Sequence, residues 1–332
     1  MNFRNRLSLG FKIVEYNLFK KSAPLNVKLS LNNSCNARCN YCNFPNRSQK
    51  ELTTNQIFSL IDQLENIGTK RLGLCGGEPL LRKDVGDIID YAKEKGLFVT
   101  LNSNGYLLSK KIEDLKNLDI LILSFDGPEK AHDTNKEKGS FRKVMEAFKA
   151  ARKLKKIWTI TVLTKYNTNS IDFIIKMAKK YNFSTSFQII CNDSPLIRNT
   201  EKFLSSNEEY KRVIKKLIDE KKRGAPIILS FKTLKELLEW KNFKITSFYD
   251  KNSKCYAGKL FCHIDTDGSV YPCSMTVGKM KSKNFLDEGF KNAFESIKDS
   301  PCTRCGFAPY IEYNNIFSLN LEAILNSSKQ LS

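Results

Sequence analysis

Residues 34–45 read SCNARCNYCNFP and place Cys35, Cys39 and Cys42 in a C-x3-C-x2-C pattern. The pattern follows an apolar run, residues 27–31, that predicts a β-strand. Three thiolates on one short loop can hold three corners of a cubane iron-sulfur cluster, whereas the usual electron-transfer cluster takes four cysteines. The loop therefore predicts a cluster in which one iron is left open for another ligand.

Zinc is the alternative occupant of such a loop. A structural zinc takes four tetrahedral ligands, and its cysteines usually come as C-x-x-C pairs. The whole chain has only two histidines with which to complete a zinc site. The triplet therefore favours an iron-sulfur cluster over zinc.

The composition weighs against some partners. The 332 residues include 55 Lys and Arg against 35 Asp and Glu, which gives a net charge of +20. A basic surface can attract nucleic acid, anionic lipid or acidic substrates. The lysines are spread along polar helix faces without a dense basic block. We therefore expect a solvated, lysine-rich surface and no nucleic-acid partner.

Nothing in the sequence predicts a membrane span or a secretion signal. No apolar run approaches the ~20 residues that a spanning helix needs, and no N-terminal apolar stretch precedes a small-residue cleavage site. The ten cysteines are clustered, which favours metal ligation in a reducing compartment. We expect a soluble, cytoplasmic protein of one large or two modest domains.

Strand patterns alternate with helix patterns six times, which predicts a parallel β/α architecture. The expected strands are residues 27–31, 71–75, 97–101, 120–125, 157–163 and 186–191. The expected helices are residues 54–67, 84–95, 109–117, 140–155, 170–181 and 206–223. Thr54 is the expected cap of the first of them, and Gly68 its stop.

Polar and glycine-rich segments follow the expected strands, where the chemistry of parallel barrels is located. These segments are Gly76-Gly77-Glu78-Pro79, Asn102-Ser103-Asn104-Gly105, Ser124-Phe125-Asp126-Gly127-Pro128 and Asn167. Each of them alone can be an ordinary turn or loop. Their ordered occurrence at successive strand ends favours a binding site.

The cysteine spacing, with Tyr41 before the last cysteine, resembles the signature of the radical S-adenosylmethionine (SAM) superfamily, and the GGEP and S-x-D-G segments follow in that family's order. The resemblance implies an α/β fold, a partial (β/α)6 TIM-like barrel, in which the open iron binds the amino and carboxylate groups of SAM. The SAM-binding residues that it implies are Tyr41, Gly76, Gly77, Glu78, Pro79, Ser103, Asn104, Ser124, Asp126 and Asn167. Asp126 is also a candidate for facing the substrate, and loop capping is an equal alternative for Asn167.

The segment from His132-Asp133 to Lys136 is similar to an HD-x-x-R loop of the same family. Lysine does not reproduce a bidentate arginine contact to a carboxylate. We therefore assign Lys136 no SAM role, and we expect His132 to be a structural loop residue.

A second cysteine group follows in the order C-x12-G-x4-C and then C-x-x-C: Cys255, Cys273, Cys302 and Cys305. Four thiolates can saturate a second cubane cluster or a zinc ion. The arrangement resembles the SPASM and twitch auxiliary-cluster modules. Because no cysteine follows Cys305, the resemblance implies one auxiliary cluster, which is closer to twitch, in a small C-terminal domain made of a short β-hairpin and a helix.

Three cysteines remain outside both groups. Cys75 is expected in the core, and Cys262 is expected to be a strand residue together with His263. Cys191, at the end of the sixth strand, is either a hydrogen-atom or proton donor or a buried structural cysteine.

The chain is expected to divide into residues 1–24, 25–245 and 246–332. Residues 7–19 place Leu7, Phe11, Val14 and Leu18 at helical spacing. We expect an amphipathic helix that packs on the barrel, with peripheral contact to a membrane surface as the alternative.

The resemblance implies reductive cleavage of SAM to a 5'-deoxyadenosyl radical that abstracts a hydrogen atom, with two 4Fe-4S clusters and an external electron donor such as flavodoxin or ferredoxin. An auxiliary cluster ligated only by thiolates suits a net oxidation. A peptide, a sugar-like small molecule and a lipid stay open as substrates, the peptide being less favoured because only about 26 residues precede the first strand. A non-catalytic electron carrier or a zinc scaffold is the alternative function.

Overall fold

The computed structural model describes residues 3–192 and 194–331. Its main sheet has the order β10-β9-β8-β1-β2-β3-β4-β5-β6, and β1 to β6 are parallel neighbours. The strands are β1 (Asn26–Ser30), β2 (Arg71–Cys75), β3 (Phe98–Ser103), β4 (Ile120–Ser124), β5 (Ile157–Leu163), β6 (Ser184–Ile189), β8 (Phe261–Ile264), β9 (Ser269–Tyr271) and β10 (Lys283–Asn284). The expected α/β partial barrel is confirmed.

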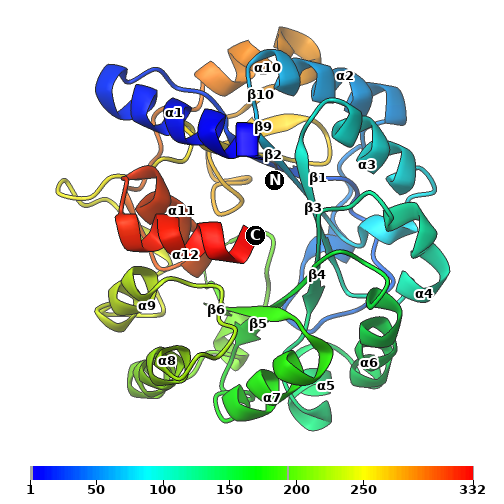
Figure 1. Ribbon diagram of the computed structural model, residues 1–332, viewed down its shortest axis with the longest axis vertical. Coiled ribbons are helices and arrows are strands. Elements are labelled where there is room, and N and C mark those ends of the chain that lie inside the picture. The colour runs from blue at the N-terminus through cyan, green and yellow to red at the C-terminus, as the bar shows by residue number, and fades with distance from the viewer. Residues whose placement is uncertain (1–2, 193, 332) are drawn as a thin grey trace.

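Helices cover the outer side of the curved sheet, and α11 and α12 lie on the side where the curve is not closed (Figure 1). The α-helices are α1 (Phe3–Phe19), α2 (Thr54–Asn66), α3 (Val85–Glu94), α4 (Leu108–Lys111), α5 (Glu129–Asn135), α6 (Ser140–Ala151), α7 (Ile171–Tyr181), α8 (Asn207–Lys222), α9 (Phe231–Leu238), α10 (Phe285–Glu295), α11 (Ala308–Phe317) and α12 (Leu321–Leu331). Short 3-10 turns are η1 (Phe44–Asn46), η2 (Pro79–Leu81), η3 (Glu113–Leu115) and η4 (Thr200–Lys202).

Helix α2 illustrates how local sequence sets an element. Its cap is Thr53 rather than the expected Thr54, because Thr53 and Gln56 form a reciprocal capping box. The helix buries an apolar stripe that packs on the sheet. It stops before Gly68, whose positive φ of 84° suits a glycine at a helix end.

Two expected elements differ in the structure. The helix expected over 109–117 is split into α4 and η3, because the buried residues Ile112, Leu115 and Leu118 recur every three positions, which is the 3-10 period. The sixth strand begins and ends two residues earlier than expected, and its register with β5 ends at Ile189. Cys191 therefore lies just beyond the strand.

The C-terminal region shares the sheet of the barrel. Strand β8 pairs in parallel with β1, with Cys262 opposite Val27, and then forms an antiparallel hairpin with β9. The expectation that Cys262 and His263 are strand residues is confirmed. The Asp265 carboxylate, just after β8, receives a hydrogen bond of 2.9 Å from Arg47 of the cysteine loop's far end. The expected domain boundary at 245–246 is thus spanned by one sheet and stays a prediction.

Helix α1 packs through a different face from the one expected. Leu9, Ile13 and Tyr16 contact an aromatic cluster of the C-terminal region, whereas Phe11 is 72% and Leu18 68% exposed. The sequence carries two apolar stripes, and the stripe at 9, 13 and 16 forms the contact. The side chain of Leu7 lies outside the described residues. Over the described part of the chain, every helix falls short of the length and apolar character needed to cross a membrane.

Candidate functional site

The first cysteine loop runs from the end of β1 to η1 and is held by two other loops. Asn40 N donates to the carbonyl of Lys136, at 3.2 Å, on the loop after α5. Arg198 N donates to the carbonyl of Tyr41, at 2.9 Å, and Cys42 forms an isolated antiparallel bridge with Ile197. Backbone hydrogen bonds therefore fix the loop at the carboxyl end of the barrel.

The three thiols of this loop lie within electrostatic reach of one another. Burial raises the pKa of Cys39 to about 12, and the ammonium of Lys136 opposes that rise. The Cys35 Sγ receives hydrogen bonds from Ala37 N at 3.4 Å and from the Asn104 amide at 3.8 Å. Buried thiols near a cation and amide donors can become thiolates once a metal replaces their protons.

The donor set of this loop is three cysteine thiols. A cubane cluster places its thiolates at separate corners of one body, so three thiols on one short loop fit three of its corners. Among the described residues, no set of three His, Cys, Asp or Glu side chains stands in position to hold a single metal ion.

The Gly76-Gly77 segment packs against the cysteine loop. Gly77 N donates to the Asn32 carbonyl and Glu78 N to the Ser34 carbonyl, both at 2.8 Å. A Cβ on Gly77 would lie 2.2 Å from the Ser34 oxygen, so any larger residue would push the loop away. The glycines thus permit close approach to the cysteine-loop backbone, and Pro79 then begins η2.

Glu78 is fully buried and ties two strand ends together. Its carboxylate accepts hydrogen bonds from Ser103 Oγ at 2.8 Å, Asn104 N at 2.8 Å and Leu80 N at 3.1 Å. Burial raises the pKa of Glu78 to about 7, against the effect of these hydrogen bonds. The side chain therefore positions the β3 end, which the sequence could not predict.

The β3 end forms a polar ridge beside the cysteine loop. The Asn104 amide donates to Asn36 Oδ1 at 2.9 Å, and its oxygen accepts from Tyr106 N. Ser103 Oγ also accepts from Gly105 N. Ser124, half-buried at the end of β4, lies on the strand next to β3 in the sheet. The ridge brings the predicted residues Ser103 and Asn104 next to the cysteine loop.

Asp126 is the centre of a buried network. Its carboxylate accepts from Tyr41 OH at 3.3 Å and Val162 N at 2.9 Å, and it forms an ion pair with Lys136 at 3.4 Å. Lys136 Nζ also donates to Tyr41 OH at 2.6 Å. Burial opposes the charge on Lys136, but Asp126, Tyr41 and Cys39 together raise its pKa well above the ordinary value.

Lys136 is the site residue that the sequence reasoning missed. It is buried and its charge acts on both Cys39 and Cys42. Its place in the HD-x-x-K segment was a usable signal, because a lysine in a loop that otherwise favours arginine still delivers a cation there. Tyr41 and Asp126, by contrast, point their polar atoms at Lys136 and at one another.

Asn167 and His132 have their polar atoms engaged by protein. The Asn167 oxygen accepts from Thr164 N at 2.8 Å, and its nitrogen donates to the carbonyls of Asp126 and Val162. This is the loop-capping alternative. His132 Nδ1 accepts from Asp126 N at 3.1 Å, and burial lowers the pKa of His132 to about 4, which fits the expected structural role.

The second cysteine group is gathered from separate segments into an aromatic environment. Burial raises the pKa of Cys273 to about 12, and the neighbouring Cys255 and Cys302 raise it further. Cys305 accepts a hydrogen bond from Phe307 N at 3.3 Å and lies within electrostatic reach of Cys273, Cys255 and Cys191. The four predicted cysteines are thus brought together, and Cys191 joins them as a fifth.

The described fold and motifs agree with known proteins. The family model "Radical SAM superfamily" matches residues 29–178. An AdoMet-dependent heme synthase of Methanosarcina barkeri is 27% identical over 318 residues, which cover 87% of this chain and 89% of that protein. A PqqA peptide cyclase of Bradyrhizobium diazoefficiens is 30% identical over 164 residues, 47% of this chain and 43% of that protein.

Solved structures share the architecture at low identity. Streptococcus suis SuiB bound to S-adenosylmethionine is 18% identical, with a TM-score of 0.67 over 87% of this chain and 69% of that one. A polyhistidine-tagged anSMEcpe with bound AdoMet is also 18% identical, with a TM-score of 0.65 over 92% of this chain and 99% of that one. Residues 29–178 thus match the radical SAM superfamily, and the wider architecture of the chain is shared with SuiB and anSMEcpe.

Proposed function

We propose that the loop of Cys35, Cys39 and Cys42 holds the SAM-binding 4Fe-4S cluster of an enzyme that abstracts a hydrogen atom from its substrate. When bound to the reduced cluster, SAM supplies a 5'-deoxyadenosyl radical, the species that removes the hydrogen atom. The observation that carries the proposal is a three-thiol loop fixed beside a polar ridge at the carboxyl end of the barrel strands.

The neighbouring residues divide into those that border the SAM site and those that support it. The backbone of residues 76–79, with Ser103, Asn104 and Ser124, forms the border. Glu78 positions the β3 end through its carboxylate, while Asp126, Tyr41 and Asn167 support the wall from behind. Lys136 supplies a positive charge that favours thiolates at Cys39 and Cys42.

We assign the auxiliary cluster to Cys255, Cys273, Cys302 and Cys305. Four thiolates leave no iron open, so this cluster suits electron transfer rather than substrate binding. A net oxidation such as dehydrogenation or cross-linking releases electrons that such a cluster can accept. The first cluster needs an external one-electron donor, such as flavodoxin or ferredoxin, in the cytoplasm.

Several substrate classes are compatible with this proposal. The relatives include a peptide cyclase and a heme synthase by name, so a peptide and a small metabolite both stay in the proposal, together with a sugar-like alcohol and a lipid. In a non-catalytic electron carrier, the hydrogen-bonded group of Glu78, Ser103 and Asn104 would have no ligand beside it.

Anaerobic reconstitution tests the proposal. We expect about eight irons per chain, four for each cubane cluster, and release of 5'-deoxyadenosine from SAM with dithionite. Stoichiometric zinc together with inert SAM would reject the enzyme in favour of a zinc scaffold. Eight irons with inert SAM would favour the electron carrier.

The exposed stripe of α1 supports a peripheral membrane contact. Phe11, Leu18 and Phe19 are each more than two-thirds exposed, and a basic protein is attracted to anionic lipid. We expect the F11S/L18S variant to co-sediment less with phosphatidylserine liposomes than the natural chain. Equal co-sedimentation would remove the membrane from the proposal. Changing this stripe leaves the packed residues Leu9 and Ile13 in place.

A further inference from the structure

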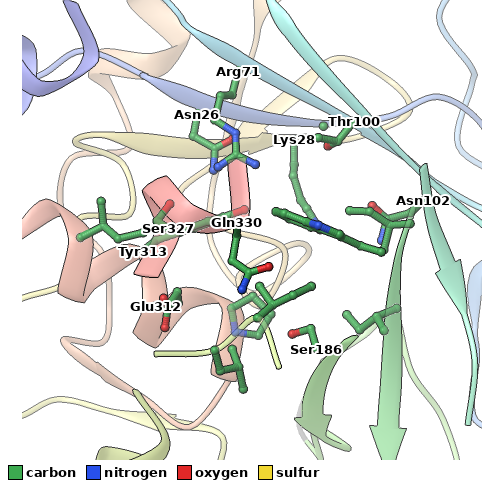
Figure 2. A pocket seen from close by; sticks show the side chains of 18 of the residues that line it. Asn26, Lys28, Arg71, Thr100, Asn102, Ser186, Glu312, Tyr313, Ser327 and Gln330 are labelled. Atoms are coloured by element: carbon green, nitrogen blue, oxygen red, sulfur yellow. The ribbon is translucent and has the colours of Figure 1, made fainter. Parts of the chain in front are cut away.

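A chamber of about 110 Å³ lies inside the barrel, beneath the polar ridge. Strands β1 to β6 form its wall, and α11 and α12 close its open side. Figure 2 shows Arg71 and Lys28 from neighbouring strands and Gln330 from α12 extending into this space. The chamber is smaller than the roughly 300–1,000 Å³ of pockets for drug-sized ligands. It therefore suits a compact ligand.

Three polar atoms at the chamber lack a hydrogen-bond partner. These buried atoms are Arg71 Nε, Asn102 Oδ1 and Trp158 Nε1, and none of them meets a partner within the described chain. Buried polar groups are almost always hydrogen-bonded, because leaving them unpaired is costly. Two donors and one acceptor around one space point to a polar ligand that completes their bonding.

Two cations line the chamber, and its one carboxylate, Glu312, accepts hydrogen bonds from Ser230 and Asn326 rather than from them. Lys28 and Arg71 form no ion pair among the described residues. Glu312 is the one carboxylate of the lining, and it is engaged by Ser230 N at 2.9 Å and Ser230 Oγ at 2.7 Å. The Glu312 carboxylate therefore interacts with Ser230, the residue that caps α9, and not with Lys28 or Arg71. An oxyanion fits the two cations, and the guanidinium fork suits a bidentate contact.

The chamber has a direction relative to the cysteine loop. Arg71 is the first residue of β2, whereas Asn102 is near the end of β3, two residues before the Asn104 that contacts Cys35. In the strand register Ile122 and Trp158 lie level with Asn102, and the apolar surfaces of these residues and of Ile160 line the wall at that end. A ligand with its anionic end at Arg71 would extend its apolar body toward the ridge.

Gly73 is a neighbour of one of the cations. It lies opposite Lys28 in the pairing of β1 with β2, and a Cβ placed there would lie 3.4 Å from both Lys28 Cγ and Thr100 Oγ1. A Cβ at these distances would be in ordinary van der Waals contact, so Gly73 leaves the wall beside the lysine stem open without relieving a clash. The Lys28 side chain extends from this wall into the chamber (Figure 2).

We propose that this chamber binds a compact substrate that carries an oxyanion, a carboxylate or a phosphate, on an apolar and flat body. Arg71 and Lys28 hold the anionic end, the Trp158 indole N–H donates to it or to a neighbouring oxygen, and Asn102 accepts from a donor nearer the ridge. That the chamber binds an oxyanion is inferred from its lining alone, whereas the role of this ligand as the substrate rests on the proposed function.

Calorimetry on the anaerobically reconstituted protein tests the chamber with three probes: benzoate, phenyl phosphate and neutral benzamide. We expect benzoate or phenyl phosphate to bind more tightly than benzamide, and the tighter of the two anions identifies the natural headgroup. R71M and K28M should each weaken binding of that anion by about 10-fold or more, the usual loss for a charged hydrogen bond. K28R, which keeps the charge, should bind within a few-fold of the natural chain.

K110M provides the matched control, because Lys110 is an exposed lysine on α4 that does not line the chamber. It should bind the anions like the natural chain. Benzamide binding equal to that of both anions, no binding of either anion, or anion binding unchanged in both R71M and K28M would each overturn the proposal. Because the readout is binding, failure of SAM cleavage would reject the proposed function without touching this result.

Discussion

Cys35, Cys39 and Cys42 lie on one short loop beside a buried lysine. The second group, by contrast, comes from three segments, which carry Cys255, Cys273 and the Cys302–Cys305 pair and meet among aromatic rings. Burial raises thiol pKa values in both groups, but Lys136 opposes the rise at Cys39, while the neighbours of Cys273 are other thiols. The first group is therefore local and has a buried cation beside it. The second depends on the folded C-terminal region, where Lys259 favours the thiolate of Cys255 and the hydrogen bonds of Met275 N and Thr276 favour that of Cys273.

The largest expected effect comes from removing the first group. C35A/C39A/C42A should abolish 5'-deoxyadenosine release and lower the iron content from about eight to about four per chain. Iron counting and electron paramagnetic resonance check this outcome. Cleavage of SAM by the triple variant would contradict the assignment of the open iron to this loop.

C302A/C305A should give the complementary result. We expect the iron content to fall to about four as well, while SAM cleavage in the absence of substrate persists, because the first loop is held by β1 and by residues 195–198 rather than by this pair. Loss of SAM cleavage alongside a normal spectrum of the remaining cluster would show that the two groups do not act separately.

Removing Lys136, the buried cation beside the first cysteine group, should lower the stability of the fold. In K136M the buried Asp126 carboxylate loses its ion-pair partner, and we expect a loss of about 3 kcal/mol in unfolding free energy, the usual cost of an uncompensated buried charge. Denaturant unfolding measures it, with K149M, an exposed lysine of α6, as control. The double variant D126N/K136M should recover much of the loss; if it does not, the ion pair is not the cause.

The smallest expected effect is a pH dependence, with one buried histidine in each region. Burial lowers the pKa of both His132 and His263 to about 4, from an ordinary value of 6.5. Below pH 6.5 the unfolded chain binds protons on these two histidines that the folded chain excludes, so their contribution to stability should fall as pH drops from 6.5 toward 4. The buried Glu78, whose pKa is raised to about 7, binds a proton in the folded chain over the same range and offsets part of this fall. Each histidine contributes up to about 1.4 kcal/mol per pH unit.

Unfolding measured at pH 7 and pH 5.5 checks this slope. H132N keeps an acceptor in place of Nδ1, and H263Q keeps one in place of Nε2, which lies 3.3 Å from Ser30 Oγ. In each variant, the change in unfolding free energy between pH 7 and pH 5.5 should be smaller by the contribution of the histidine that was replaced. An unchanged slope in both variants would mean that other groups cause the acid sensitivity.

The sequence was sufficient for the parallel strands β1 to β6 and for the position of the motifs along them. It was insufficient for the pairing of β8 with β1 and for the direction of side chains. Residues 71–75 and 157–163 are strands with the expected bounds, because short apolar runs between turn signals suit buried parallel strands. The exposure of Phe11 and Leu18 was not predictable, since α1 carries two apolar stripes and tertiary contacts select one.

The roles of the polar motif residues show the same limit. The resemblance implies Glu78, Asp126 and Asn167 as SAM-binding residues, and in the structure their carboxylate and amide groups form hydrogen bonds that join neighbouring loops. Which loop approaches which carboxylate depends on long-range packing that spacing does not encode. The same reason explains why Lys136 was left without a role and why Cys191 could not be placed beside Cys305.

The parallel pairing of β8 with β1 has a mechanical consequence. Strand β1 leads into the first cysteine loop, and strand β8 leads toward Cys273. The two are hydrogen-bonded neighbours in one sheet, and Arg47 donates a hydrogen bond to Asp265 just past their ends. Two redox centres held next to these paired strands would keep a nearly constant distance for electron tunnelling while outer helices and loops move. The barrel would then serve as a spacer for electron exchange as well as a container for the radical.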